Sequence, residues 1–141
     1  MMMWIDYLDS MDVRKVSPDN RLAKSIIEIS DRRINFLKPQ KIDSNNAPII
    51  LSEYYEALHE ICRAIFAVKG FKTHSHESIT AFLKEVLNEN EFSVIFDRYR
   101  KIRNGINYYG KTVGASEAEL CSQECINAIN KLKNHHLKGV L

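Results

Sequence analysis

The sequence predicts an all-α protein, folded as an up-and-down bundle of four to five helices. Apolar residues recur at steps of three and four in several stretches, which is the helical period. No stretch alternates apolar and polar residues for long, and glycine is sparse, with 5 in 141 residues. Proline and capping residues stand where the periodic stretches begin. We therefore expect helices joined by short polar loops.

The length predicts a single domain, and 45% hydrophobic residues suffice for one core. We expect an N-terminal extension at 1–16, the helical bundle at 17–136 and a frayed tail at 137–141. In the extension, Trp4, Tyr7 and Leu8 follow helical steps and predict a short helix laid over the bundle. The sequence contains no internal repeat and no low-complexity tract.

Composition excludes several classes of function. The longest apolar runs are far shorter than the roughly 20 residues that cross a bilayer, and Met1 to Ser10 lacks the pattern of a secretion signal, so we expect a cytoplasmic protein away from membranes. Three cysteines without a C-x-x-C spacing argue against disulfides and zinc. No glycine-rich phosphate loop, nucleophile elbow or His-Glu-x-x-His helix occurs. We expect no metal and no cofactor. A net charge of +2 allows nucleic-acid binding without arguing for it.

The first long helix is expected to start at Ser17-Pro18-Asp19, where a side-chain oxygen can cap it and proline fits its first position. It ends before Pro39, and a polar loop follows to Asn46. Its expected buried face comprises Leu22, Ile26, Ile29, Leu37 and the stem of Arg33.

The second long helix has the clearest helical pattern of the chain. Asn46 or Ser44 can cap it, Pro48 lies in its first turn and Gly70 ends it. Its predicted buried face comprises Leu51, Tyr54 or Tyr55, Leu58, Ile61, Cys62, Ile65 and Val68. A row of acids, Glu53, Glu56 and Glu60, lines another face. This row either pairs with a basic helix, through Glu56 or Glu60, or is simply solvated.

The remaining chain predicts three further helices. A loop at 71–74 precedes a helix that Ser75 caps and that reaches Asn88, with Ile79, Phe82, Leu83, Val86 and Leu87 buried. The next helix buries Phe92, Phe96, Tyr99, Ile102, Ile106 and Tyr109, and Gly110 ends it in the left-handed region. Ser116 and Glu119 predict a capping box for the last helix, which buries Leu120, Cys121, Cys125, Ile129 and Leu132.

One short stretch concentrates positive charge and polar groups. From Arg98 to Ser116 the chain carries five cationic residues and no acid: Arg98, Arg100, Lys101, Arg103 and Lys111. Helical spacing places Arg103 beside Asn107, and Asn104 beside Tyr108. A planar guanidinium matches a phosphate better than an ammonium does, and the amide and phenol can donate to a sugar or base. The alternative is that Arg103 caps carbonyls or pairs with Asp97 or a glutamate.

Arg103-Asn104 followed by Tyr108 resembles the Arg-Asn-x-x-x-His core of the HEPN (higher eukaryotes and prokaryotes nucleotide-binding) domains, with tyrosine in place of the histidine. Further similar segments are Tyr54-Tyr55-Glu56-Ala57, Arg63-Ala64-Ile65 through Lys69-Gly70-Phe71-Lys72, and Ser75-His76-Glu77. The resemblance spans about Ser17 to Leu132, most of the chain.

The resemblance implies a homodimer or heterodimer in which two arginine-bearing helix ends share a cleft. It also implies metal-independent RNA cleavage by attack of the ribose 2′-OH on the adjacent phosphorus. Arg103 would stabilise the developing charge, and Asn104 would orient Arg103 or the ribose. Tyr108 is a poor general base at neutral pH because a phenol has a pKa of ~10, against ~6.5 for an imidazole. His74 or His76 can substitute for the missing imidazole.

Three functions follow. The first, which we favour because Tyr108 replaces the histidine, is a non-catalytic module that binds RNA or a nucleotide in a dimer cleft, of a toxin–antitoxin or nucleotidyltransferase-partner type. The second is an active HEPN ribonuclease. The third is a helical interaction protein that binds neither, in which Tyr108 and Tyr109 can accept a modification by analogy with relatives. Beside Arg103, Asn104 and Tyr108, the candidate binding residues are Arg98, Arg100, Asn107, Tyr109, Lys111, His74, His76, Glu56 and Glu60.

Overall fold

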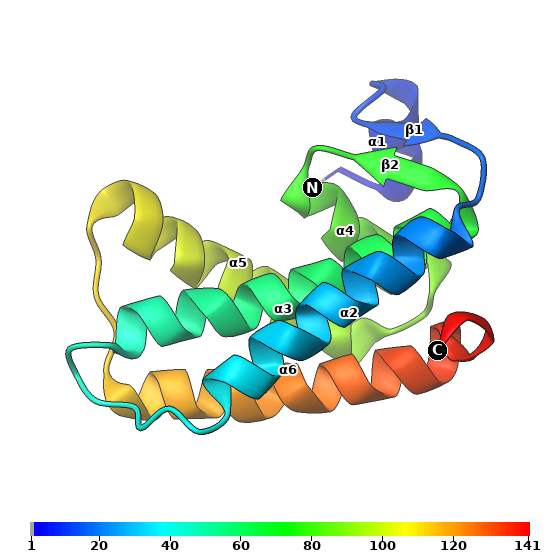
Figure 1. Ribbon diagram of the computed structural model, residues 1–141. Helices are drawn as coiled ribbons and strands as arrows, with labels where there is room; N and C mark the ends of the chain where they lie inside the picture. The colour runs from blue at the N-terminus through cyan, green and yellow to red at the C-terminus, as the bar shows by residue number, and fades with distance from the viewer. Residues whose placement is uncertain (1) are drawn as a thin grey trace.

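The computed structural model describes residues 2–141 and confirms the predicted helical bundle (Figure 1). Its main helices alternate in direction along the bundle: α2 (Asn20–Leu37), α3 (Ala47–Lys69), α5 (Asn90–Tyr109) and α6 (Ala115–His136). Shorter elements complete the chain: α1 (Trp4–Asp9), α4 (His76–Ala81), a π-helical turn (Phe82–Val86), a 3-10 turn (Lys138–Val140) and strands β1 (Val13–Lys15) and β2 (Phe71–Thr73). No described helix has the length and apolarity needed to span a bilayer.

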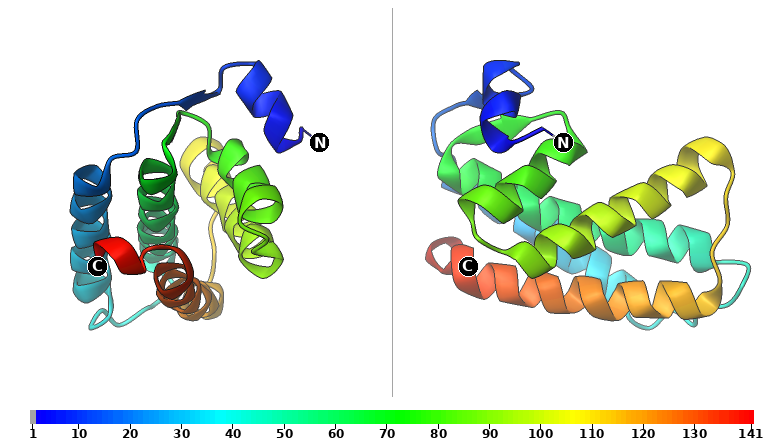
Figure 2. Two further views of the ribbon diagram at one scale, coloured as in Figure 1. Left: turned by 90° about the vertical axis from the view of Figure 1, so that its right-hand side faces the viewer. Right: turned by 180° about the vertical axis from the view of Figure 1, so that it is seen from behind.

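Helix α3 is the centre of the bundle, with α2 on one side, α5 on the other and α6 packed below (Figure 2). Its predicted buried face is confirmed from Leu51 to Ile65, while Val68 is only partly buried. The helix begins at Ala47 with Pro48 in the first turn and ends at Gly70, whose φ is +80°. A Cβ at Gly70 would also lie 2.7 Å from the Val16 carbonyl oxygen. Both the backbone conformation and the lack of space therefore require glycine there.

The buried face of α2 differs from the predicted one. Ile26 and Leu37 are buried as expected, but Leu22 and Ile29 are nearly half exposed, at 48% and 47%. Other positions are buried in their place, two of them small residues, because α2 packs directly against α3 and Ser30 donates a hydrogen bond of 2.9 Å to the Ala57 carbonyl oxygen. The additional buried positions of α2 are Ala23, Ile27, Ser30 and Ile34.

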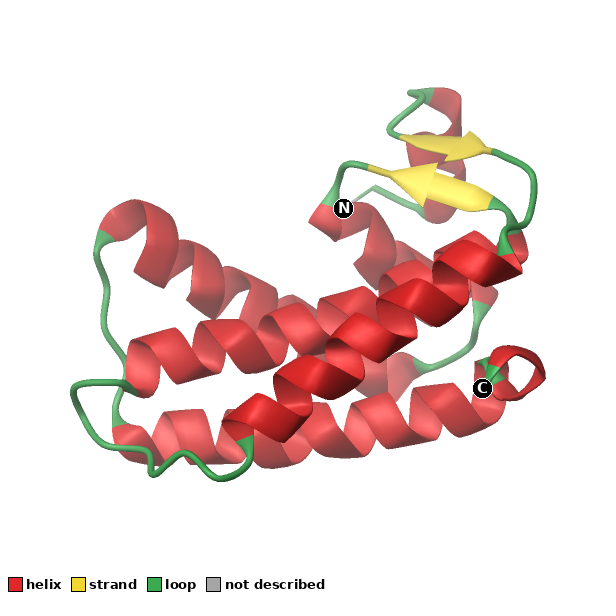
Figure 3. Cartoon of the chain, viewed as in Figure 1, coloured by secondary structure: helices red, strands yellow, loops and turns green. Residues whose placement is uncertain are grey.

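The two strands are the elements that sequence patterning missed, and they lie together at one end of the bundle (Figure 3). Residues 71–73, expected as a loop, form β2 and pair antiparallel with β1, with Val13 opposite Thr73. A strand of three residues is too short to show a period of two. The predicted N-terminal helix is present as α1, and its residue Trp4 packs against Phe66, Phe71 and Phe82. Residue 1 of the expected extension lies outside the described chain.

The segment between β2 and α5 is less regular than the single helix that we expected. Ser75 caps α4 as predicted, accepting a hydrogen bond of 3.2 Å from the Ser78 N–H. The helix then widens into the π-helical turn, which shifts its buried face, so Val86 is exposed instead of buried. Asn88 adopts a φ of +56° and reverses the chain into α5.

Helix α5 leaves the bundle at its C-terminal end, where it diverges from α3 and α6 (Figures 1 and 2). Its predicted buried face is therefore buried at Phe92, Phe96 and Tyr99 but not at Tyr109, which is 77% exposed. Gly110 ends the helix with a φ of +64°, as predicted.

Helix α6 begins earlier than predicted, at Ala115, and Glu117 rather than Glu119 accepts a hydrogen bond from the N–H of the capping residue, Gly114, at 3.4 Å. Leu120 is exposed, while the predicted Cys121, Cys125, Ile129 and Leu132 are buried. The tail expected to fray at 137–141 instead starts with Leu137, which is buried in the core.

Candidate functional site

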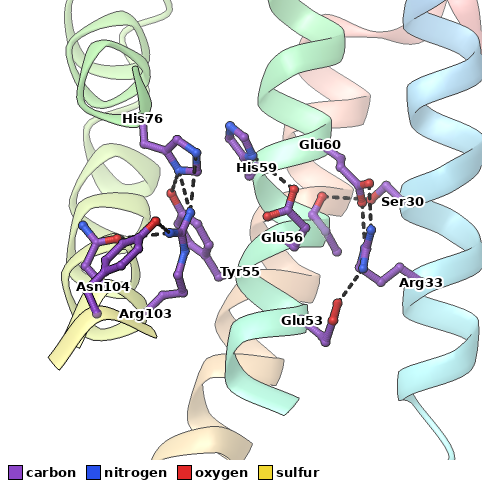
Figure 4. A network of polar contacts seen from close by, with 12 residues as sticks. Ser30, Arg33, Glu53, Tyr55, Glu56, His59, Glu60, His76, Arg103 and Asn104 are labelled. Atoms are coloured by element: carbon purple, nitrogen blue, oxygen red, sulfur yellow. Dashed lines mark hydrogen bonds and ion pairs between the residues drawn. The ribbon is translucent and has the colours of Figure 1, made fainter. Parts of the chain in front are cut away.

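Arg103, on the exposed C-terminal half of α5, is the centre of a cluster contributed by three helices (Figure 4). Its guanidinium donates to Asn104 Oδ1 at 3.1 Å, to the Tyr108 hydroxyl at 3.5 Å and to His76 Nδ1 at 3.1 Å. The Arg103 Cζ also lies 5.2 Å from the centre of the Tyr55 ring. We call these residues, with His59 described below, the Arg103 cluster: Tyr55, His59, His76, Arg103, Asn104 and Tyr108.

The Arg103 guanidinium is held by neutral groups. The ion pairs found among residues 2–141 engage its neighbours Arg98, Arg100 and Lys101, but not Arg103. Arg103 is half buried, and each of its hydrogen-bond partners is an amide, a phenol or an imidazole. Its positive charge is therefore fixed in position and not neutralised, which is the arrangement that favours an anion.

His76, at the start of α4, turns the edge of its ring toward the Arg103 guanidinium. Arg103 NH2 lies 3.1 Å from His76 Nδ1 and 3.5 Å from Nε2, and because a guanidinium can only donate, the shorter contact fits the tautomer with an unprotonated Nδ1. Tyr55 reaches the same Nδ1, with its hydroxyl at 2.6 Å. Burial, reinforced by nearby His59 and by the Arg103 charge, lowers the pKa of His76 to about 4. His76 is thus neutral at physiological pH.

His59, on α3, extends the cluster away from Arg103. Its ring stacks on His76 with centroids 4.0 Å apart, and its Nδ1 lies 3.4 Å from Glu56 Oε1. The hydrogen bond from His59 lowers the pKa of Glu56, so Glu56 is ionised at neutral pH. Sequence reasoning missed His59, although its spacing from Tyr55 puts both rings on one helix face. A chain of titratable groups therefore runs from α3 through α4 to α5.

Most of the predicted basic face is neutralised. Arg98 pairs with Glu124 of α6 at 2.6 Å. Arg100 pairs with Asp97 at 2.8 Å, and Lys101 pairs with the same carboxylate at 3.1 Å. The sequence from 98 to 116 holds no acid, but Asp97 and a neighbouring helix supply the missing carboxylates. Arg98 and Arg100 thus have carboxylate partners within the chain, and their role in binding stays a prediction.

The predicted pairing of Glu56 or Glu60 with the Arg103 helix is wrong. Glu60 instead receives two hydrogen bonds from Arg33 of α2, at 3.0 and 3.1 Å, and Arg33 also binds Glu53. Glu53 and Glu60 of the acid row therefore face α2, whereas Glu56 lies beside His59 (Figure 4). The solvated alternative also fails at Glu60, which is buried.

The other predicted residues surround the cluster or lie apart from it. Asn107 and Tyr109 are exposed beside Arg103 on α5, and the side chain of Lys111 lies against Gly105. His74 is exposed and lines a separate surface pocket near β2. Of the two histidines that the sequence suggested as substitutes, only His76 contacts Arg103.

Comparison with known proteins gave no relative: no protein-family model matches the chain, and neither the curated proteins nor the solved structures include a significant match. The geometry of the Arg103 cluster is therefore the basis from which function is inferred.

Proposed function

We propose that this protein is a HEPN-like helical module that binds RNA or a nucleotide at the Arg103 cluster, in a cleft that a second subunit completes. The observation that carries the proposal is a half-buried guanidinium, fixed by three neutral partners and paired with no carboxylate. A phosphate oxygen supplies the counter-charge that this arginine lacks.

The surroundings of Arg103 suit a nucleotide better than a bare anion. Asn104 offers an amide beside the guanidinium, and Tyr108 a phenol that is 69% exposed. Tyr109 is exposed next to it, and aromatic side chains in such positions stack on unpaired bases. Phosphate, sugar and base can each find a partner within about two turns of helix.

A second subunit fits the same end of α5. This end diverges from α3 and α6 (Figure 2), and Asn107, Tyr108 and Tyr109 on it are exposed. Two copies that meet there would enclose a cleft lined by two Arg103 clusters. The alternative partner is a nucleotidyltransferase encoded by a neighbouring gene, or the antitoxin of a toxin–antitoxin pair. In such a pair, the exposed Tyr108 and Tyr109 are the accessible acceptors for a modification.

We expect Arg103→Ala to weaken the binding of a labelled single-stranded RNA at least tenfold. The slope of log Kd against log salt should fall by about 1, because one phosphate contact is lost. Fluorescence anisotropy in excess chelator measures both quantities. The free energy of unfolding should stay within about 0.5 kcal/mol, since Arg103 holds no buried charge pair.

Arg98→Ala is the matched control for that titration. It removes an equal charge five residues away, but its guanidinium is occupied by Glu124, so binding should change less than twofold. Equal weakening by both variants would indicate a diffuse electrostatic surface and would count against the proposed site. Failure of the wild-type protein to bind RNA, ATP or GTP, together with co-purification of a partner, would favour the interaction role.

One observation favours the alternative of an active ribonuclease. His76 places an imidazole 3.1 Å from Arg103 although the motif itself has tyrosine at position 108. A neutral imidazole in that place can take the 2′-OH proton once the substrate displaces the Tyr55 hydroxyl from Nδ1, a role worth roughly 10²–10⁴ in rate. His76→Gln should then abolish cleavage in chelator while leaving RNA affinity within about threefold. Cleavage that persists in His76→Gln would remove His76 from the mechanism.

The pKa of His76 provides a further prediction. It is about 4 in the folded protein and 6.5 in the unfolded chain, so the unfolded state binds more protons between these pH values. The histidine therefore stabilises the fold above pH 6.5, and this stability is lost as pH falls toward 4. We expect a loss of roughly 1–2 kcal/mol after allowing for solvent screening, absent in His76→Gln. Urea unfolding at pH 7.5 and pH 4.5 measures it.

Phosphate binding should move the same pKa upward, because a nearby dianion favours the imidazolium. By linkage, nucleotide affinity should rise as pH falls from the raised pKa of the bound state toward 4, the pKa of His76 in the free protein. Proton NMR of the His76 ring, with and without nucleotide, tests the shift. A pKa unchanged by saturating nucleotide would place the bound phosphate away from the Arg103 cluster.

A further inference from the structure

Three metal-ligating side chains converge where α5 begins and α6 ends, at the far end of α5 from Arg103. Glu89 immediately precedes α5, and His135 and His136 are the last two residues of α6. Glu89 Oε2 lies 3.0 Å from His135 Nδ1 and 3.5 Å from His136 Nε2, and one ligand atom from each residue falls within 4.8 Å of the others. We propose that these three residues bind a divalent transition-metal ion of the zinc type, which fastens the start of α5 to the end of α6.

The spacing of the ligand atoms fits such an ion. With bonds of about 2.0–2.2 Å, two ligands of a tetrahedral zinc ion lie roughly 3.3–3.6 Å apart. The two distances from the carboxylate are already close to this value. The adjacent histidines use different nitrogens, Nδ1 and Nε2, which lets neighbouring residues reach one point. Small rotations of the side chains would bring all three ligand atoms to the distances of a tetrahedral site.

His136 carries an unexplained polar atom at this place. Its Nε2 is buried and lacks a hydrogen-bond partner within normal limits, with Glu89 Oε2 at 3.5 Å as its nearest polar neighbour in the cluster. Buried polar atoms are rarely left unpaired in proteins, so each one calls for an explanation. A metal ion bonded to Nε2 would satisfy it. His135 is half exposed, which leaves a route for the ion and room for a water ligand.

The backbone around Glu89 is shaped to present this carboxylate. The π-helical turn Phe82–Val86 ends just before it, and Asn88 takes a left-handed conformation with a φ of +56°. The Glu89 N–H then donates to the Leu83 carbonyl oxygen at 2.8 Å, which fixes the start of α5. π-helical turns are frequent at functional sites. Leu137 directly follows the two histidines. It is buried in the core and therefore anchors the end of α6.

The donor set determines the class of ion. Two imidazoles and one carboxylate suit zinc, cobalt, nickel or iron, whereas magnesium and calcium prefer oxygen ligands. The site is remote from the Arg103 cluster, since thirteen residues of helix between 90 and 103 span roughly 20 Å. We therefore assign it a structural role that is independent of the proposed function.

The test uses the full, untagged chain stripped with chelator and titrated with zinc chloride in a calorimeter. We expect one ion per chain and a rise in Tm of roughly 5–10 °C when zinc is a hundredfold above its Kd. Glu89→Gln and His135→Ala should each weaken zinc binding at least tenfold. Both residues lie at least partly at the surface, so these variants should fold even if His136→Ala does not.

Two control variants sharpen the test. His74→Ala removes an exposed histidine outside the cluster and should leave the zinc affinity unchanged. Lys69→Met removes a positive charge that acts on His136, and should leave the affinity equal or higher. Absence of zinc binding, binding unaffected by Glu89→Gln and His135→Ala, or one ion per two chains with a doubled mass would overturn the proposal. None of these results depends on RNA binding, so the two proposals fail separately.

Discussion

Phe82→Ala should lower the free energy of unfolding by about 3–5 kcal/mol, the largest effect that we expect from a single substitution in this chain. Phe82 is fully buried in the π-helical turn, and its ring centre lies 4.5 Å from that of Phe66 and 5.2 Å from that of Trp4. Truncation removes the transfer free energy of the ring and leaves a cavity between α1, α3 and the turn. Urea unfolding followed by circular dichroism measures the loss.

Val86→Ala is the matched control, since it lies in the same π-helical turn but is exposed. Its cost should stay below about 1 kcal/mol. A loss below about 1.5 kcal/mol for Phe82→Ala, with an unchanged m-value, would contradict the tight aromatic packing and mean that the N-terminal segment adds little to the core.

Arg33→Met should cost about 2–4 kcal/mol, the second-largest effect. Arg33 holds Glu60 through two hydrogen bonds, and the Glu60 side chain is only 6% exposed. Removing the guanidinium leaves this carboxylate buried without its cation, a change that costs ~3–5 kcal/mol in fully buried pairs. Arg33 is itself 29% exposed, so water can reach the vacated place and the expected loss is smaller.

The double variant Arg33→Met with Glu60→Leu identifies the cause. If the stranded charge is responsible, the double variant should recover most of the loss, because an apolar pair of similar volume often replaces a buried ion pair without cost. Arg32→Ala, at an exposed neighbouring position, should stay within 0.5 kcal/mol. No recovery in the double variant would show that the loss arises from packing of the Arg33 stem.

The sequence was sufficient to predict the long helices because their signals are local. Pro48 and Gly70 mark the ends of α3, and the apolar residues between them follow one helical face. The same reasoning failed for α2, where Ala23 and Ser30 are buried in preference to Leu22 and Ile29. That choice depends on how closely α3 approaches, which is a property of the pair of helices. Pairing of β1 with β2 joins residues 60 apart, as at Val13 and Thr73, and has no local signal.

The candidate site was predicted in part for the same reason. Arg103, Asn104 and Tyr108 belong to one helix, so their proximity follows from spacing alone. His76 was considered only as one of two loop histidines, and its contact with Arg103 depends on the placement of α4 against α5. The pairing of Arg98 with Glu124 and of Glu60 with Arg33 likewise joins separate helices. Charge patterns within one helix do not reveal such partners.

The packing of Trp4 against Phe66, Phe71 and Phe82 has a spectroscopic consequence. Trp4 is the only tryptophan in the sequence, so the intrinsic indole emission reports the docking of α1 and not the integrity of the four long helices. Circular dichroism reports those helices instead. A denaturation curve recorded by fluorescence therefore follows the first few residues of the chain, and its coincidence with the dichroism curve would show that they melt together with the bundle.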